Sequence, residues 1–202
     1  MRVIIRCTKQ QEEEILAKET LLNVEMIFTE DKDKFCHTNG DVFFDLITDE
    51  SAIEIVKKDT PIFISSVLHT CKELPENCIR INGWNGFLQR NIIEIATNKH
   101  QEYVQNIMNV LGWKYQFVPD EIGMIAPRII AMIVNEAYFA LEDNVSTPEE
   151  IDTALKLGTN YPFGPFEWSN KIGLKNIYLL LQKLSLQDIR YTPSELLQSK
   201  AN

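Results

Sequence analysis

The sequence contains little glycine and proline, with 8 residues of each type among 202. Together they make about 8% of the chain, against about 12% in an average protein. The sequence also lacks any run of about 18 uncharged apolar residues, which a membrane-spanning helix needs. Apolar residues nevertheless make up 45% and charged residues 24%. This balance excludes a collagenous, low-complexity or disordered chain and indicates one or two domains with a buried core.

Basic residues are fewer than acidic ones, 20 against 29, and they form no basic block. Nucleic acid and anionic membranes are therefore not expected as partners. The chain has three histidines, and its four cysteines form no C-x-x-C pair, so we expect no metal site. The apolar stretch after Met1 is too short for a secretory signal, and we expect a cytoplasmic protein without disulfides.

Strands alternate with helices over residues 1–117, which predicts an α/β domain. The expected strands cover 2–7, 24–29, 41–47, 61–67, 79–81, 91–97 and 115–118, because each is rich in β-branched or aromatic residues. The expected helices cover 12–22, 51–58 and 102–111, with Thr8 as a candidate N-cap, while 31–41 is polar and typical of a loop. The first strand, helix and strand predict a right-handed parallel crossover.

Residues 118–202 carry no strand pattern and predict an all-α domain with a polar tail from residue 192. Apolar residues at helical spacing predict helices over 122–141, 166–172 and 174–184. Thr147, Pro148 and Glu150 form a strong helix start, and Gly158 is the expected end of that helix.

An ordered series of motifs runs from Val118 to Leu184. It comprises Val118-Pro119-Asp120, Arg128-Ile129, Asn135-Glu136-Ala137, Pro148-Glu149-Glu150-Ile151-Asp152 and Gly158-Thr159-Asn160-Tyr161-Pro162-Phe163-Gly164-Pro165-Phe166-Glu167. This series resembles the C-terminal helical domain of the 3-hydroxyacyl-CoA dehydrogenase family. The preceding part resembles, more weakly, a shortened form of the family's Rossmann-like NAD-binding domain. The resemblance implies NAD as the family cofactor and acyl-CoA or fatty acid metabolism as the setting.

The glycine fingerprint that binds a dinucleotide is missing. Its glycines make a tight turn and let the pyrophosphate approach the helix N-terminus. When 2–5 is aligned with the family's first strand, the three glycine positions hold Cys7, Lys9 and Glu12. Carboxylates at a helix N-terminus stabilise the helix but repel a diphosphate. Glu30 follows the second strand at the position that reads the ribose in the family, but it also fits an ordinary loop acid. We therefore expect no bound cofactor.

The family's catalytic motif is a histidine base with a glutamate twelve residues later. Glu94 matches the glutamate, but the histidine position holds Asn82, whose amide cannot accept a proton as a base. The family's asparagine on the long helix is replaced by Pro127. The hydroxyl-bearing motif falls at Ser65 and Ser66, and the alignment does not decide which serine corresponds. The candidate site residues are thus Glu94, Ser66 and Asn82, the last without a role as base.

Two further departures concern substrate binding and alternative chemistry. About 45 residues of the family, including a helical arm that helps to hold CoA, are missing between the second strand and 41–45, so at most weak acyl-CoA binding is expected. His69 follows Ser66 by three residues and Cys71 is near, which makes a Ser/His or Cys/His nucleophile pair conceivable. A histidine near a strand end is more often simply hydrogen-bonded.

Two hypotheses for function follow. In the first, the chain has lost dehydrogenase chemistry and acts as a binding or assembly module. In the second, it is a working NAD-dependent 3-hydroxyacyl-CoA dehydrogenase with an atypical site. The residues favour the first. In the family the helical domain forms a two-fold dimer, and here the 122–141 segment is apolar on more than one face, so we expect a homodimer through 122–184.

Overall fold

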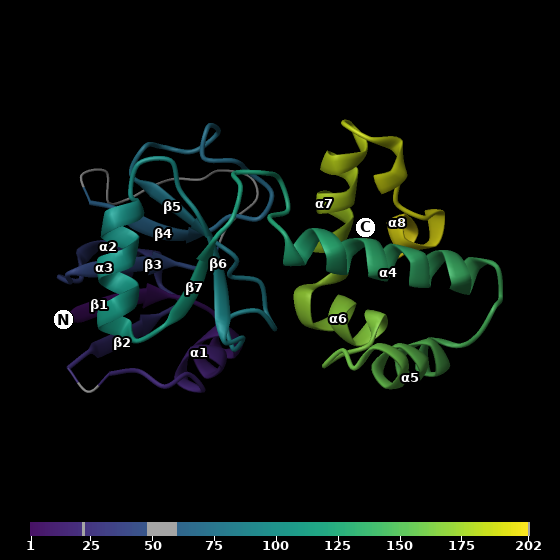
Figure 1. Cartoon of the computed structure of the whole chain (residues 1–202), viewed down its shortest axis with the longest axis horizontal. Coiled ribbons are helices and arrows are strands. Elements are labelled where there is room, and N and C mark those ends of the chain that lie inside the picture. The colour runs from purple at the N-terminus through teal and green to yellow at the C-terminus, as the bar shows by residue number, and fades with distance from the viewer. Residues whose placement is uncertain (22, 48–59, 202) are drawn as a thin grey trace. The chain divides into compact units, whose positions relative to one another are not determined.

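The computed structural model describes residues 1–21, 23–47 and 60–201. The chain divides into two compact units, Met1–Met124 and Ile125–Asn202 (Figure 1). Residues 118–124, assigned to the helical part by their sequence, pack within the first unit. Val118 and Met124 share an apolar cluster with Ala96, and the Gly123 N–H donates to the Val67 carbonyl at 2.8 Å. The expected helix 51–58 lies outside the described residues.

The first unit is built on a seven-stranded sheet in the order β2-β1-β3-β4-β5-β6-β7. All neighbouring strands are parallel except β5 and β6. The parallel pairing of β1 with β2 confirms that the predicted crossover joins parallel strands. The strands are β1 Arg2–Arg6, β2 Glu25–Thr29, β3 Val42–Asp45, β4 Ile62–Ser65, β5 Cys78–Ile81, β6 Ile92–Ala96 and β7 Lys114–Phe117. Each begins and ends within two residues of its expected bounds, which is the usual uncertainty of strand ends.

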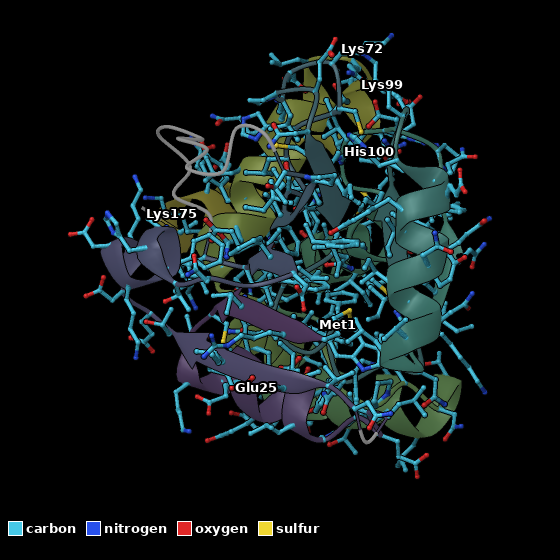
Figure 2. The ribbon with its side chains drawn as sticks, turned by 90° about the vertical axis from the view of Figure 1, so that its left-hand side faces the viewer. Met1, Glu25, Lys72, Lys99, His100 and Lys175 are labelled. Atoms are coloured by element: carbon cyan, nitrogen blue, oxygen red, sulfur yellow. The ribbon has the colours of Figure 1, made fainter. Side chains whose placement is uncertain are left out.

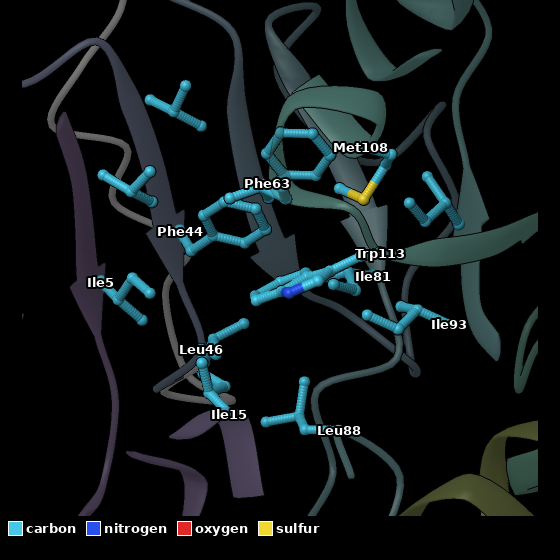
Figure 3. Close-up of a cluster of buried hydrophobic side chains, with 14 of the residues drawn as sticks. Ile5, Ile15, Phe44, Leu46, Phe63, Ile81, Leu88, Ile93, Met108 and Trp113 are labelled. Carbon is cyan, nitrogen blue, oxygen red and sulfur yellow. The ribbon is translucent and has the colours of Figure 1, made fainter. Parts of the chain in front are cut away.

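Helices α1 (Lys9–Leu16) and α3 (Gln101–Leu111) cover one face of this sheet (Figure 3). Phe44 and Phe63 stack there with ring centroids 4.4 Å apart, and Trp113 packs beside Phe44. This face carries a larger apolar cluster than the opposite face, and side chains of both α1 and α3 belong to it. Gly112 ends α3 in a left-handed conformation, as its sequence predicts.

The expected helix 12–22 was placed too late in the chain. Thr8 and Gln11 form a capping box that starts α1 at Lys9, and the helix ends at Leu16. After Leu16 the side chains of Lys18 and Thr20 make hydrogen bonds to residues of distant segments. The Lys18 ammonium donates to the Arg90 carbonyl, and Thr20 accepts from the Trp113 indole at 3.3 Å.

The opposite face of the sheet carries a smaller cluster under helix α2 (Lys32–His37). The sequence predicted a loop here, and that prediction is wrong. Asp31 caps the helix by accepting from the Lys34 N–H at 2.8 Å, and Phe35 is fully buried against Phe43. One short capped turn with one apolar anchor is too brief for a helical pattern to emerge from a polar segment.

Arg80 is a fully buried charge in strand β5. Its Nη1 lies 2.5 Å from Asp120 Oδ1, while Nε and Nη2 donate to the carbonyls of Ser66 and Glu121, each at 3.1 Å. Asp120 also accepts from the Cys71 N–H at 2.8 Å. Burial raises the pKa of Asp120, but these hydrogen bonds and the guanidinium outweigh it and hold the pKa below its usual value. These hydrogen bonds connect β5 to the residue after β4, Ser66, and to the segment after β7 that contains Asp120 and Glu121.

The second unit is helical throughout its described residues. Its elements are α4 Ala126–Glu142, α5 Pro148–Thr159, α6 Pro165–Ile172, α7 Leu174–Ser185, a 3₁₀ turn Ile189–Tyr191 and α8 Glu195–Ala201. Helix α4 starts later than its apolar pattern suggested, because Gly123 and Met124 have positive φ angles. Helix α5 runs one residue past Gly158, and Asn160 takes the left-handed cap position. None of the described helices is long and apolar enough to span a membrane.

The tail from residue 192 is not unstructured, as its polarity suggested, but contains α8. Asn135 of α4 anchors it: its amide donates to the Thr192 carbonyl at 2.9 Å, and its oxygen accepts from the Ser194 N–H at 2.9 Å. Ser194 in turn accepts from the Leu197 N–H, and Leu197 is fully buried. A single apolar anchor and one buried amide are enough to fold this segment.

Asp152 and Gly164 explain the most recognisable motif of the second unit. The Asp152 carboxylate accepts from the backbone N–H groups of Phe166 at 2.8 Å and Glu167 at 3.2 Å, and thus caps α6 from α5. A Cβ atom on Gly164 would lie 2.3 Å from Asp152 Oδ1, so a side chain is excluded there.

Removing the Asp120 carboxylate should strongly destabilise the first unit. Asp120→Ala leaves the Arg80 guanidinium buried without its charge partner, which costs about 3–5 kcal/mol. Urea unfolding followed by tryptophan fluorescence measures this. Glu76→Ala is the matched control, because the Glu76–Lys99 pair is exposed and its loss should change the free energy of unfolding by less than about 1 kcal/mol. Equal effects of both substitutions would contradict this account.

Candidate functional site

The carboxyl ends of β1 and β3 form the topological switch point of the sheet. From β1 the chain moves to β2 on one side and then returns to β3 on the other. Ligands of open parallel sheets bind at such a point, with phosphates at the N-terminus of the first helix. The candidate site therefore comprises the N-terminal turn of α1 and the described residues that directly follow β3, β4 and β5.

The chain itself uses two of the backbone donors in the first turn of α1. The Gln11 N–H donates to Thr8 Oγ1 at 3.3 Å, and the Lys9 N–H donates to Glu30 Oε1 at 3.2 Å. Glu30, at the position that reads a ribose in the family, is thus occupied with the helix N-terminus. Glu12 in the same turn adds a carboxylate 3.3 Å from the Lys9 ammonium.

The Gln11 side chain fills the space between α1 and the strand ends. Its Nε2 donates to the carbonyls of Leu46, after β3, at 2.9 Å and Gly83, after β5, at 2.8 Å. The residue is only 6% exposed. One amide therefore satisfies two carbonyl groups from loops on different strands, at the place where the fold normally admits a phosphate.

Two more residues of α1 bind the loop after β5. The Glu14 carboxylate accepts from the Gly86 N–H at 2.6 Å, and Gln10 accepts from the Asn85 amide at 3.1 Å. Glu14 is 6% exposed. Together with Gln11 these contacts attach the helix to residues 82–86 along one side.

The three residues at the family's glycine positions lie at this same turn. Burial and the nearby carboxylates of Glu12 and Glu30 raise the pKa of the Cys7 thiol to about 12, so Cys7 is a neutral, unreactive group. Lys9 and Glu12 lie in the first turn of α1. The structure thus places all three where the sequence alignment expected them.

Asn82 and Glu94, which are expected at the catalytic positions, lie opposite each other on neighbouring strands. The antiparallel register of β5 and β6 pairs Ile81 with Ile95, and the Asn82 N–H donates to the Glu94 carbonyl at 3.2 Å. Asn82 is buried, and its side-chain oxygen accepts from the Trp84 N–H at 3.4 Å. The two candidate residues are thus neighbours across the sheet, and residue 82 carries an amide.

Ser65 and Ser66 are both buried at the end of β4. Ser65 lies against Gly83, where an added Cβ would come within 2.7 Å of the Ser65 hydroxyl. The Ser66 hydroxyl is 3.5 Å from the His69 carbonyl, not its ring. Burial, aided by Asp120, raises the pKa of the Cys71 thiol to about 11. These contacts give no support to a Ser/His or Cys/His nucleophile pair.

Arg6 and Asp45 form an ion pair at the ends of β1 and β3, with Nε and Oδ1 3.1 Å apart. Arg6 also donates to the Ile47 carbonyl at 2.6 Å. Burial raises the pKa of Asp45 to about 6, although the Arg6 guanidinium lowers it. This charge pair adds no net positive field for a phosphate. The described residues contain no group of three or more potential metal ligands.

Gln11 and Glu14 were not among the expected site residues. The sequence Thr8-Lys9-Gln10-Gln11 carries the T-x-x-Q signature of a capping box, which could have placed the helix start and turned attention to Gln11. Nothing local marks Glu14, because its partner is 72 residues away.

Comparisons with known proteins agree with this architecture. Residues 123–202 match the model of the 3-hydroxyacyl-CoA dehydrogenase C-terminal domain. The chain is 42% identical over 108 residues to the 3-hydroxyadipyl-CoA dehydrogenase of Escherichia coli, covering 52% of this chain and 22% of that protein. It is 32% identical over 150 residues to a 3-hydroxybutyryl-CoA dehydrogenase of Bradyrhizobium diazoefficiens, covering 71% and 51%. The chain thus spans about a fifth of the first relative and about half of the second.

A solved structure shares the fold. The (S)-3-hydroxybutyryl-CoA dehydrogenase of Ralstonia eutropha superposes with a TM-score of 0.66 at 21% identity, over 87% of this chain and 69% of that one. This likeness is evidence of a common fold, a Rossmann-like domain followed by a helical one. Residues 123–202 thus match the C-terminal domain of the 3-hydroxyacyl-CoA dehydrogenase family, and the chain is similar to two dehydrogenases that share it.

Proposed function

We propose that this chain is a family member without NAD-dependent dehydrogenase activity that acts as a binding or assembly module. The observation that carries the proposal is the position of Gln11. Its amide donates hydrogen bonds to the carbonyls of Leu46 and Gly83 at the sheet's switch point. The side chain therefore fills the position that a phosphate of a dinucleotide takes in this fold.

The residues present do not fit the family cofactor. Phosphate binding needs free backbone N–H groups and close access to the helix N-terminus. Here Thr8 and Glu30 accept from two of those N–H groups, and Glu12 adds a negative charge that repels a diphosphate. Thr8 and Glu30 compete with a phosphate for the N–H groups, and Glu12 repels its negative charge.

The reacting centre lacks its proton acceptor as well. A positioned general base contributes about 10²–10⁴ in rate, and an amide at residue 82 has no basic lone pair at neutral pH. Glu94 remains opposite Asn82, but a glutamate that orients a histidine has no imidazole to orient here.

A working dehydrogenase with an atypical site is the alternative. It is favoured by the names of the relatives, which are dehydrogenases, and by the preserved pairing of residue 82 with Glu94. Binding and activity measurements separate the two functions.

NADH should not stabilise the protein. A ligand present at 100 times its dissociation constant raises the free energy of unfolding by about 2.7 kcal/mol, so a thermal-shift titration is sensitive to micromolar binding. We expect no saturable shift up to about 1 mM NADH, because Gln11 and Glu30 occupy the phosphate position. A stabilisation that saturates at micromolar NADH would refute the proposal. The titration is repeated with an active 3-hydroxybutyryl-CoA dehydrogenase as the positive control.

The protein should not oxidise 3-hydroxybutyryl-CoA. We expect NADH formation, followed by absorbance, to equal the blank, and acyl-CoA to bind weakly at most. Asn82→His alone should not create activity, because a restored base does not open the cofactor position. Activity in the wild type that disappears in Glu94→Ala, or activity in Asn82→His, would show that the site is better preserved than we propose.

Assembly would use the exposed face of α4. Ile125, the N-cap residue of α4, and Ile129 and Phe139 within the helix are 42%, 49% and 37% exposed. Ile129 and Phe139 follow Ile125 by 4 and 14 residues, close to whole helical turns, so all three lie on one side. The wider apolar surface suggested by the sequence is largely internal: Val134 and Tyr138 of α4, and Leu180 of α7, are buried within the unit. A charge at Leu180 would therefore unfold the unit rather than test an interface.

Phe139→Asp should weaken a homodimer formed through the second unit without unfolding it. A carboxylate on the exposed face of α4 cannot be buried against a partner without a large desolvation cost. Light scattering measures the mass, and circular dichroism checks the helical content. Lys175→Glu, a charge change at an exposed position of α7, is the control and should leave the mass unchanged. A wild type that scatters as one chain of 23.3 kDa at micromolar concentration would contradict this interface.

A further inference from the structure

Strand β2 lies at the edge of the sheet, paired with β1 on one side only among the described residues (Figure 1; Figure 2 labels Glu25 at its start). In the six-stranded dinucleotide-binding fold a further strand covers the second strand, in the order 3-2-1-4-5-6. Here the chain passes from β2 into the short helix α2 and then to β3 on the far side of β1. The edge that a further strand normally occupies is therefore presented by β2.

The hydrogen bonds to β1 show which backbone groups face outward. The Glu25 N–H donates to the Met1 carbonyl at 2.9 Å, and the Thr29 carbonyl accepts from the Cys7 N–H at 3.0 Å. Because successive residues of a strand point to opposite neighbours, Ile27 also faces β1, whereas the N–H and C=O groups of Met26 and Phe28 point away from it.

This edge strand has neither the lysine nor the proline that often blocks pairing. Natural proteins protect edges with lysine, proline or bulges. The other edge strand, β7, starts with Lys114 and alternates polar with aromatic residues. Strand β2 has the sequence Glu-Met-Ile-Phe-Thr, with three consecutive apolar residues, no lysine and no proline, and it stays in register with β1 over all five residues.

The edge is complementary to a second copy of itself. An antiparallel pair centred on Ile27 places Met26 opposite Phe28 of the other copy, and both residues direct their backbone groups outward. The two Met26–Phe28 pairs, one on each side of the axis, together form four backbone hydrogen bonds. Met26 and Phe28 lie on the same face as the larger apolar cluster, so the thioether meets an aromatic ring across the two-fold axis. Glu25 then faces Thr29, and no like charges are opposed.

We propose that β2 pairs with β2 of a second copy of this chain in antiparallel fashion, which joins two seven-stranded sheets into one. This contact is separate from the face of α4 and goes beyond the proposed function. If both contacts form, each chain has two two-fold interfaces and the assembly holds four or more chains.

Met26→Pro tests the contact while leaving β1–β2 pairing intact. The outward N–H of Met26 is not needed inside the chain, and proline is tolerated on an edge strand when its position faces solvent. Met26→Thr is the matched control, because it removes the same side chain but keeps the N–H and favours a strand. We expect Met26→Pro to weaken the association at least tenfold and Met26→Thr to retain it, with circular dichroism showing both to be folded.

The same substitutions in a Phe139→Asp background distinguish this contact from the one on α4. Light scattering should give two chains of 23.3 kDa for Phe139→Asp and one for Phe139→Asp with Met26→Pro. If Phe139→Asp does not change the mass, the α4 interface fails, and Met26→Pro alone must then convert dimers to monomers. An unchanged mass in every Met26→Pro variant overturns the β2 contact.

A cross-link provides a second measurement that does not depend on proline. In this pairing Ile27 lies opposite Ile27 of the second copy at a non-hydrogen-bonded position. The Cα atoms of such a pair are about 4.5 Å apart, which is within the range of about 4.4–6.8 Å that a disulfide spans. Ile27→Cys in a Cys36→Ser and Cys71→Ser background, oxidised by glutathione disulfide, should give a covalent dimer. The same background with Ile27 retained should stay monomeric on a non-reducing gel. Failure of Ile27→Cys to cross-link overturns the proposal.

Discussion

Every buried backbone donor and acceptor needs a partner, and this requirement shapes the site at the sheet's switch point. In a dinucleotide-binding domain the ligand's phosphates supply partners for the first turn of the helix. In this chain Thr8, Gln11 and Glu30 supply them instead, and Gln11 also serves the carbonyls after β3 and β5. Thr8 and Glu30 thus accept hydrogen bonds from the helix N-terminus that a phosphate accepts in a dinucleotide-binding domain.

The sheet could be predicted from sequence because its strands are short, buried and rich in β-branched residues. Strand β1 has Val3, Ile4 and Ile5 in succession, a pattern that belongs to a parallel strand covered on both faces. Helices α2 and α8 could not be predicted in the same way. Each has one fully buried apolar anchor, Phe35 or Leu197, and is held by caps whose polar residues also suit a loop. Tertiary packing determines whether such segments form a helix, and the local sequence pattern does not.

Only those site residues that lie a fixed, short distance apart in the sequence could be predicted. The twelve-residue interval between Asn82 and Glu94 spans the end of one strand and the middle of the next, so the two residues meet across a ladder. Gln11 depends on Leu46 and Gly83, which are 35 and 72 residues away. No periodicity connects those positions. The contacts of the Gln11 amide therefore depend on the strand order, which brings residues after β3 and β5 close to the start of α1.

The ion pair between Arg80 and Asp120 also links strand β5 to the last residues of the first unit. Arg80 lies in the fifth of seven strands, yet its guanidinium cannot give up water until its partner is present, because an unpaired buried charge costs several kcal/mol. Asp120 is among the last residues of that unit. A nascent chain that ends before Asp120 lacks this partner, so burial of the Arg80 guanidinium in it costs several kcal/mol. The first unit therefore gains its full stability only once Asp120 has been synthesised.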